Sequence, residues 1–324
     1  MKFIHCLAVI LLSSFFGSQI QSNYGETSIT LERLDTEDGQ YIYYDLYKPN
    51  TATETNKAPF IAIIPGFQRS KEALSNTAIE LSRRGHVVAL IDPYAQGLSS
   101  SSLSRRAATT QGYGMFALIE HIHNSDNYEY IDKEFLGTTG HSMGGNAAIR
   151  GANYFGKQAK ENNEPSLLHS VYVSGYVLTL TDRVLRDVKS NVGVSYALYD
   201  EGAFRNDLTG WAAADMTIAP ESLRTVNSVL RLEDTVSKVE LGRYYGDQTN
   251  NTLRVVFNEK LLHPFQPYNK EATANQLSYF DRVFPSPIKL NPYDQIWHWK
   301  ELFTLINMIA AFVLIIPLAR ALLK

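Results

Sequence analysis

The chain has 324 residues, of which 44% are hydrophobic, and its formal net charge is −3. A chain of this length can bury one large core. It has no basic stripe of the kind that binds nucleic acid, so nucleic-acid binding is set aside. Its single cysteine, Cys6, excludes internal disulfides, a cysteine nucleophile in the rest of the chain and a cysteine-ligated metal site.

The chain opens with an apolar segment. A charged start at residues 1–2 precedes an apolar run over residues 3–16, which has the length of a signal peptide. Residues 17–19 (Gly-Ser-Gln) form a poor cleavage site. Residues 1–22 are therefore predicted to be either a signal peptide or a retained N-terminal membrane anchor.

A second apolar segment covers residues 302–323 (LFTLINMIAAFVLIIPLARALL). It carries no charge before Arg320 and is long enough to span a bilayer. Aromatic residues typical of a membrane interface come just before it, at Tyr293, Trp297 and Trp299. Residues 291–324 are predicted to form a juxtamembrane segment and a C-terminal transmembrane helix; the alternative is a buried core helix.

The few positive charges beside these segments suggest an orientation. Lys2 precedes the first segment, and Arg320 and Lys324 end the second. Because positive charges favour the cytoplasmic side, both flanks are predicted to be cytoplasmic. The intervening domain, residues 23–290, is then expected on the extracytoplasmic side of the membrane.

Strand-like and helix-like patterns alternate through residues 23–290, which predicts one domain with a mostly parallel central sheet flanked by helices. The predicted strands cover residues 28–47 (two strands turning at 37–40), 60–64, 86–91, 135–139, 169–177, 192–199 and 254–262. The predicted helices cover residues 70–84, 115–123, 146–154 and 270–283. Residues 203–238 fit no sheet element and are predicted to be an insertion over one end of the sheet, a candidate cap.

The motif Gly-x-Ser-x-Gly occupies residues 140–144, between a predicted strand and a predicted helix. This context is typical of a nucleophile elbow, in which a serine sits on a strained turn above the sheet. Side chains two residues to either side would collide, which explains Gly140 and Gly144. Ser142 is therefore the predicted nucleophile; the alternative is a serine that only caps the helix.

A serine hydroxyl needs a base to remove its proton, and an acid to orient that base. The histidines after Ser142 are His169, His263 and His298. His169 precedes a mid-sheet strand, and His298 lies at the membrane edge. His263 follows the last predicted strand on a loop, at the same end of the sheet as the elbow. It is the predicted base; the alternative is a surface loop histidine.

The acid should follow a strand at the same end of the sheet. Asp200 ends the strand-like segment VGVSYALY and is the predicted acid, with Glu201 as a close competitor. Asp182 and Asp187, after the preceding strand, are weaker candidates. A solvated turn carboxylate is the alternative reading of Asp200.

The negative oxygen of a tetrahedral intermediate needs two N–H donors. One is predicted to be the backbone N–H of Met143, the residue after the nucleophile. The other is predicted to be the N–H of Phe67, in the turn Pro65-Gly66-Phe67 that follows the strand FIAII. Met143 and Phe67 thus form the predicted oxyanion hole.

With these motifs placed, the chain resembles the α/β-hydrolase superfamily over roughly residues 28–285. The elbow is similar to that of the dienelactone-hydrolase-like and lipase-like branches, and residues 240–264 look like those of a set of membrane-fused microbial hydrolases. Pro65 stands where most members carry a histidine, so the role of that histidine is absent here. The resemblance implies an α/β-hydrolase fold and carries the catalytic serine, acid and histidine onto Ser142, Asp200 and His263.

The expected function is cleavage of a carboxylic ester or thioester through an acyl-enzyme on Ser142. The expected partners are a small-molecule or lipid-like ester substrate and, through the terminal segments, the bilayer; no nucleic acid, metal or organic cofactor is expected. Two alternatives stay open. One is a peptidase or lipase of the same fold, and the other is a non-catalytic hydrolase-like ectodomain that acts as a binding module.

Overall fold

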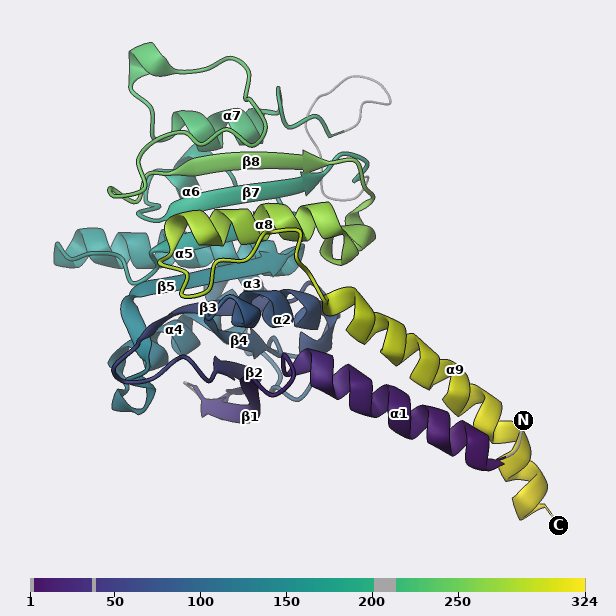
Figure 1. The fold of residues 1–324 in the computed structure, drawn as a ribbon. Coiled ribbons are helices and arrows are strands. Elements are labelled where there is room, and N and C mark those ends of the chain that lie inside the picture. Colours follow the sequence, from purple (N-terminus) through teal and green to yellow (C-terminus); the bar gives the residue numbers. More distant parts are fainter. Residues whose placement is uncertain (1–2, 37–38, 201–213, 324) are drawn as a thin grey trace.

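The computed structural model describes residues 3–36, 39–200 and 214–323. In these residues eight strands form one sheet with the order β1-β2-β4-β3-β5-β6-β7-β8 (Figure 1). The strands are β1 (Thr27–Asp35), β2 (Tyr41–Pro49), β3 (Ala58–Ile64), β4 (Val87–Ile91), β5 (Ile131–His141), β6 (Ser170–Ser174), β7 (Asn191–Ala197) and β8 (Arg254–Glu259). Strand β2 is antiparallel to both of its neighbours, and all other neighbouring strands are parallel.

Helices cover both faces of the sheet, with α2 and α8 on one face and α4 and α5 on the other (Figure 1). The helices of the domain are α2 (Ser75–Arg83), α3 (Ala107–Thr110), α4 (Met115–Asn124), α5 (Met143–Asn162), α6 (Asp182–Leu185), α7 (Pro220–Asn227) and α8 (Lys270–Val283). Alternate residues of β3 enter two separate cores, because successive strand side chains point to opposite faces. Ala62 and Ile64 join the core under α4 and α5, whereas Ile61 and Ile63 join the core under α2 and α8.

This architecture confirms the predicted fold class, and each predicted strand and helix has a counterpart. Two helices differ from their predicted extent. The helix expected over residues 70–84 begins with a 3₁₀ turn, Lys71–Leu74, before α2. Helix α5 continues beyond the predicted residue 154 to Asn162, and Asn163 ends it in the left-handed conformation, which asparagine tolerates well.

Part of the predicted cap lies in the described residues. Helix α7 packs beside the edge strand β8 (Figure 1), and Met216 and Val226 are fully buried in the core on the α5 side. The Met216 N–H donates to the side-chain oxygen of Asn258 on β8. Residues 203–213 and Glu201 lie outside the described residues, so the cap over the end of the sheet stays a prediction.

Two apolar helices, α1 (Phe3–Gln21) and α9 (Trp297–Leu322), project together from the domain and run antiparallel, with both chain ends at their far end (Figure 1). The Phe16 and Phe303 rings stack at a centroid distance of 5.4 Å, and the Asn307 side chain donates to the Ser14 hydroxyl. By length and composition, both helices are candidate membrane spans.

The first turn of α9 is fixed to α2. The buried carboxylate of Glu80 accepts hydrogen bonds from the backbone N–H groups of Ile296 (2.7 Å) and Trp297 (3.0 Å). Arg83 and Arg84 pair with the other oxygen of the same carboxylate. A buried carboxylate with four such partners is fully compensated, so this junction is a well-defined contact.

Candidate active site

The turn between β5 and α5 holds Ser142 in a strained conformation, with φ 58° and ψ −122°. Its flanking glycines leave no room for side chains. A Cβ atom on Gly144 would lie 1.9 Å from the carbonyl oxygen of Ile64, and a Cβ atom on Gly140 would lie 2.4 Å from the carbonyl carbon of Gly144. The turn therefore has the steric features of a nucleophile elbow.

His263 and Asp200 meet at the carboxyl end of the parallel strands. Asp200 comes three residues after β7, and His263 four residues after β8, where a 3₁₀ helix begins. The Nδ1 atom of His263 lies 2.6 Å from Oδ2 of Asp200, and this carboxylate is almost completely buried. A buried carboxylate in this position orients the imidazole and favours the tautomer whose Nε2 can accept a proton.

The other acids and histidines considered from the sequence lie elsewhere. Asp182 is exposed at the start of α6, and Asp187 lies 4.0 Å from Lys160 and from Arg186. His169 bonds to the hydroxyl of Ser170, and the His298 ring lies next to those of Trp297 and Trp299 on α9. The competitor Glu201 lies outside the described residues.

Ser142 and His263 line one small cavity of about 290 Å³, together with Gly66 and His141. The elbow and the histidine loop thus lie at the same end of the sheet. Within the part of the chain that the structure describes, Ser142 Oγ has no hydrogen-bond partner, so its hydroxyl is free to rotate. Catalytic hydrogen bonds in unliganded sites often form only when substrate binds.

His141 was not identified from the sequence as part of the site. Its ring centroid lies 4.5 Å from that of His263. Burial and the nearby His263 lower the pKa of His141 to about 3, so it is neutral at physiological pH. A neutral ring beside His263 adds packing without adding a second charge. The position between Gly140 and Ser142 was its only signal in the sequence.

The turn after β3 lies directly against the elbow. A Cβ atom on Gly66 would lie 3.1 Å from Ser142 Cβ and 3.7 Å from Ser142 Oγ. Phe67 follows this glycine, and Met143 is the first residue of α5. Within the described residues, neither backbone N–H donates a hydrogen bond. Both remain available for an oxygen beside Ser142.

The loop after β4 supports this turn. Gln96 Oε1 accepts a hydrogen bond of 2.7 Å from the N–H of Arg69, two residues after Phe67. The buried Asp92 carboxylate accepts from the N–H groups of Lys71 (2.8 Å) and Leu98 (3.0 Å). These bonds connect the loop to the segment that carries Phe67.

A buried polar network supports the histidine loop and was also missed. Glu259, at the end of β8, accepts hydrogen bonds from the side chains of Ser195, Gln266 and Asn275. Gln266 belongs to the 3₁₀ helix that begins at His263. Burial raises the pKa of the Glu259 carboxyl. The network fixes the path of the chain on both sides of His263.

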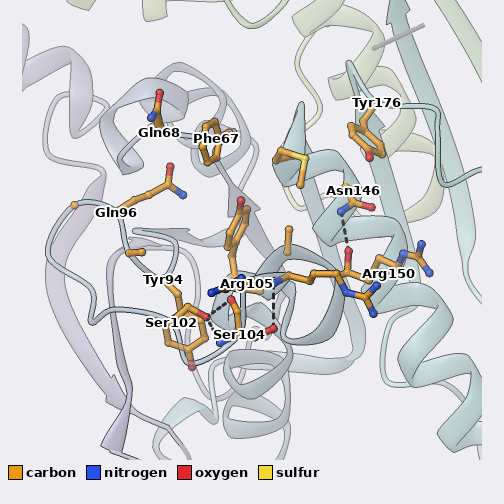
Figure 2. Close-up of a pocket in the computed structure, with 18 of the residues that line it drawn as sticks. Phe67, Gln68, Tyr94, Gln96, Ser102, Ser104, Arg105, Asn146, Arg150 and Tyr176 are labelled. Carbon is orange, nitrogen blue, oxygen red and sulfur yellow. Dashed lines mark hydrogen bonds between the residues drawn. The ribbon is translucent and has the colours of Figure 1, made fainter. Parts of the chain in front are cut away.

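A second, larger cavity of about 990 Å³ adjoins the small one, because Phe67 lines both. Figure 2 shows Phe67, Gln68 and Gln96 on one side of this cavity and Asn146, Arg150 and Tyr176 on the other. Met143 lines it as well, so the cavity reaches the expected oxyanion hole.

Comparisons with known proteins agree with this architecture. Residues 17–175 match the family described as PETase, PET hydrolase-like. No curated protein matches the sequence. The esterase Pf2001 of Pyrococcus furiosus is 12% identical with a TM-score of 0.54, and the alignment covers 79% of this chain and 93% of that one. A mutant of the esterase Est22 is 11% identical with a TM-score of 0.53, covering 84% of each chain.

At these identities the solved structures establish likeness of fold. In this chain the sheet has the order described above, and the family match over residues 17–175 includes Ser142 and Phe67. The resemblance stated from the sequence is thereby confirmed at the level of the fold: the chain has an α/β-hydrolase fold, and residues 17–175 match the PET hydrolase-like family.

Proposed function

We propose that the protein is a serine hydrolase that cleaves a carboxylic ester or thioester through an acyl-enzyme on Ser142. The observation that carries the proposal is the 2.6 Å contact between His263 and Asp200, with His263 on the same cavity as the strained Ser142. The fold likeness to two esterases and the match to the PET hydrolase-like family support an ester as the substrate.

In the proposed reaction Ser142 Oγ attacks the carbonyl carbon while His263 Nε2 takes the hydroxyl proton. Asp200 holds Nδ1–H and stabilises the imidazolium that forms. The carbonyl oxygen becomes negative and accepts hydrogen bonds from the N–H groups of Phe67 and Met143. The intermediate collapses, and His263 delivers its proton to the leaving alcohol or thiol. Water then attacks the acyl-enzyme by the same route, which releases the acid and frees Ser142.

Membrane attachment through α1 and α9 is a further part of the proposal, with the domain on the extracytoplasmic side. The stacked Phe16 and Phe303 and the bond between Asn307 and Ser14 support an antiparallel hairpin of two spanning helices. Such a hairpin requires that the first helix is retained, and not removed as a signal peptide. A substrate dissolved in water and one held in the bilayer are both compatible with this arrangement.

The decisive experiment is labelling with a fluorophosphonate probe, which reacts with activated serines. The wild-type protein should be labelled, Ser142→Ala should not, and His263→Ala should be labelled at least 100-fold more slowly. Thermal unfolding of each variant checks that it is folded. A folded wild-type protein that resists the probe would favour the non-catalytic binding module.

A further inference from the structure

Three arginines line the large cavity without a compensating charge. Arg150 lies on α5, and Arg105 and Arg106 lie on the loop that leads into α3. Within the described residues, no carboxylate lies within 4.0 Å of any of the three guanidinium groups. Several other arginines in the described part of the domain do have such a partner; Arg83, Arg84 and Arg224, for example, each pair with a glutamate.

Arg150 is the most enclosed of these three arginines. Arg105 and Arg106 are exposed, whereas Arg150 is only partly exposed and its Nε atom is buried without a hydrogen-bond partner in the described part of the chain. Burial lowers the pKa of Arg150, and the like charges of Arg183 and Arg106 add to that effect. An arginine remains charged under such conditions. The cavity therefore contains a positive charge that no carboxylate in residues 3–36, 39–200 or 214–323 compensates.

Other polar atoms of this cavity are unpaired as well. Buried atoms without a hydrogen-bond partner among the described residues are Gln96 Nε2, Asn146 Oδ1 and Thr179 Oγ1. Buried polar atoms are costly unless they gain a partner. An aliphatic acyl chain offers them none, whereas a polar substrate does.

Helix α5 sets the distance between this charge and the proposed nucleophile. Ser142 caps the helix, and Asn146 and Arg150 follow four and eight residues later. The pair is spaced i, i+4, so both residues share one helix face, and both line the cavity. Eight residues span about 12 Å along the axis, and the Arg150 side chain tilts back toward the N-terminus.

We propose that Arg150, assisted by Arg106, binds a carboxylate on the substrate. This carboxylate lies at the far end of the acyl chain from the scissile carbonyl. This inference rests on the proposed function and narrows it to esters or thioesters that carry a second, anionic end. A carboxylate matches the planar guanidinium through two parallel hydrogen bonds. Arg105 and Arg106, exposed on their loop, add positive potential that attracts such a substrate.

The test compares p-nitrophenyl half-esters of adipate, suberate and sebacate with the same compounds methylated at the free carboxylate. Each pair differs only in the distal charge. The wild-type protein should show a kcat/KM at least 10-fold higher for the charged member at the best chain length, because a charge-assisted hydrogen bond is lost in the neutral one. Increasing salt should reduce this preference. A second pair, 4-acyloxybenzoates and their methyl esters, carries the charge on the leaving group instead.

Arg150→Gln should lower the ratio of charged to neutral kcat/KM at least 10-fold, and Arg150→Lys should lower it less. The matched control is Arg183→Gln, which removes a nearby exposed charge that does not line the cavity; it should keep the ratio within about twofold. A wild-type protein without preference in either pair, or an Arg150→Gln variant with an unchanged ratio, overturns the inference while ester cleavage stands. Failure of all esters together with failure of fluorophosphonate labelling overturns the proposed function instead.

Discussion

His263 Nδ1 and Asp200 Oδ2 lie 2.6 Å apart, with 27% of the histidine side chain exposed and only 1% of the aspartate side chain. The pair thus joins a buried charge to a ring that reaches the cavity beside Ser142. This difference in exposure suits a catalytic pair in which the histidine contacts the substrate and the aspartate is shielded from water.

Replacing the acid tests this pair directly. Asp200→Asn should lower kcat by about 10³- to 10⁴-fold with little change in KM, because the amide favours the wrong tautomer of His263. The matched control is Asp182→Asn, at an exposed aspartate of α6, which should leave kcat unchanged. Full activity of Asp200→Asn together with an inactive Glu201→Gln would assign the acid to Glu201.

The elbow should not tolerate a methyl group. Gly144→Ala places Cβ against the carbonyl of Ile64, so we expect a loss of about 3 kcal/mol or more in the free energy of unfolding, or failure to fold. Gly17→Ala, on α1, places Cβ 3.7 Å from Phe303 Cβ, an ordinary van der Waals contact, and should change that free energy by less than about 0.5 kcal/mol. Urea unfolding measures both. A Gly144→Ala protein of wild-type stability would contradict the geometry of this turn.

The network below the histidine loop should position His263. Glu259→Ala leaves the donors of Ser195, Gln266 and Asn275 without their acceptor. We expect slower fluorophosphonate labelling and a loss of about 2 kcal/mol in the free energy of unfolding. Glu240→Ala, which breaks an exposed pair with Arg243, should alter neither quantity measurably. Glu259→Ala labelled at the wild-type rate would show that Glu259 does not position the base.

Acid should destabilise the domain through its buried histidines. Burial lowers the pKa of His86 to about 3, against about 6.5 in the unfolded chain. The unfolded state therefore binds more protons, and stability falls as the pH drops from about 6.5 toward 3. At pH 5 one such histidine costs about 2 kcal/mol. His86→Gln should reduce the stability difference between pH 7 and pH 5 by that amount in urea unfolding; an unchanged difference would refute the assignment.

Retention of the first helix can be read from the purified protein. If α1 and α9 form the proposed hairpin, protein extracted from membranes should keep its N-terminal helix, as measured by intact mass and N-terminal sequencing. It should also resist extraction by alkaline carbonate. A mature N-terminus between residues 17 and 27 would show that α1 is removed as a signal peptide, and would leave α9 as the only anchor of the two.

The sequence was informative where local pattern and sterics decide the structure. Buried apolar runs such as residues 60–64 predicted strands, and the two glycines around Ser142 predicted the elbow. The positions of Asp200 and His263 after strands predicted that they would lie at one end of the sheet. The structure brings these two into contact.

Contacts between segments that are far apart in sequence could not be predicted, because no local pattern marks them. Glu259 receives bonds from three other elements, and its partners are separated from each other by up to 80 residues of sequence. Arg150 looked like an ordinary helix residue, because only the fold shows that no carboxylate in the described residues compensates it. The Glu80 contact with the start of α9 spans more than 200 positions. Polar contacts of this kind depend on the folded arrangement rather than on periodicity.

The contact between Glu80 and the first turn of α9 has a mechanical consequence. A domain on a flexible linker would sample many orientations relative to its helix. Here a buried carboxylate binds the peptide groups at the junction, so we expect the helix and the domain to keep one relative orientation. If α9 crosses a bilayer, the mouth of the large cavity stays at one fixed elevation above the lipid surface. The distance of a substrate from the lipid surface then partly decides whether it can reach Ser142.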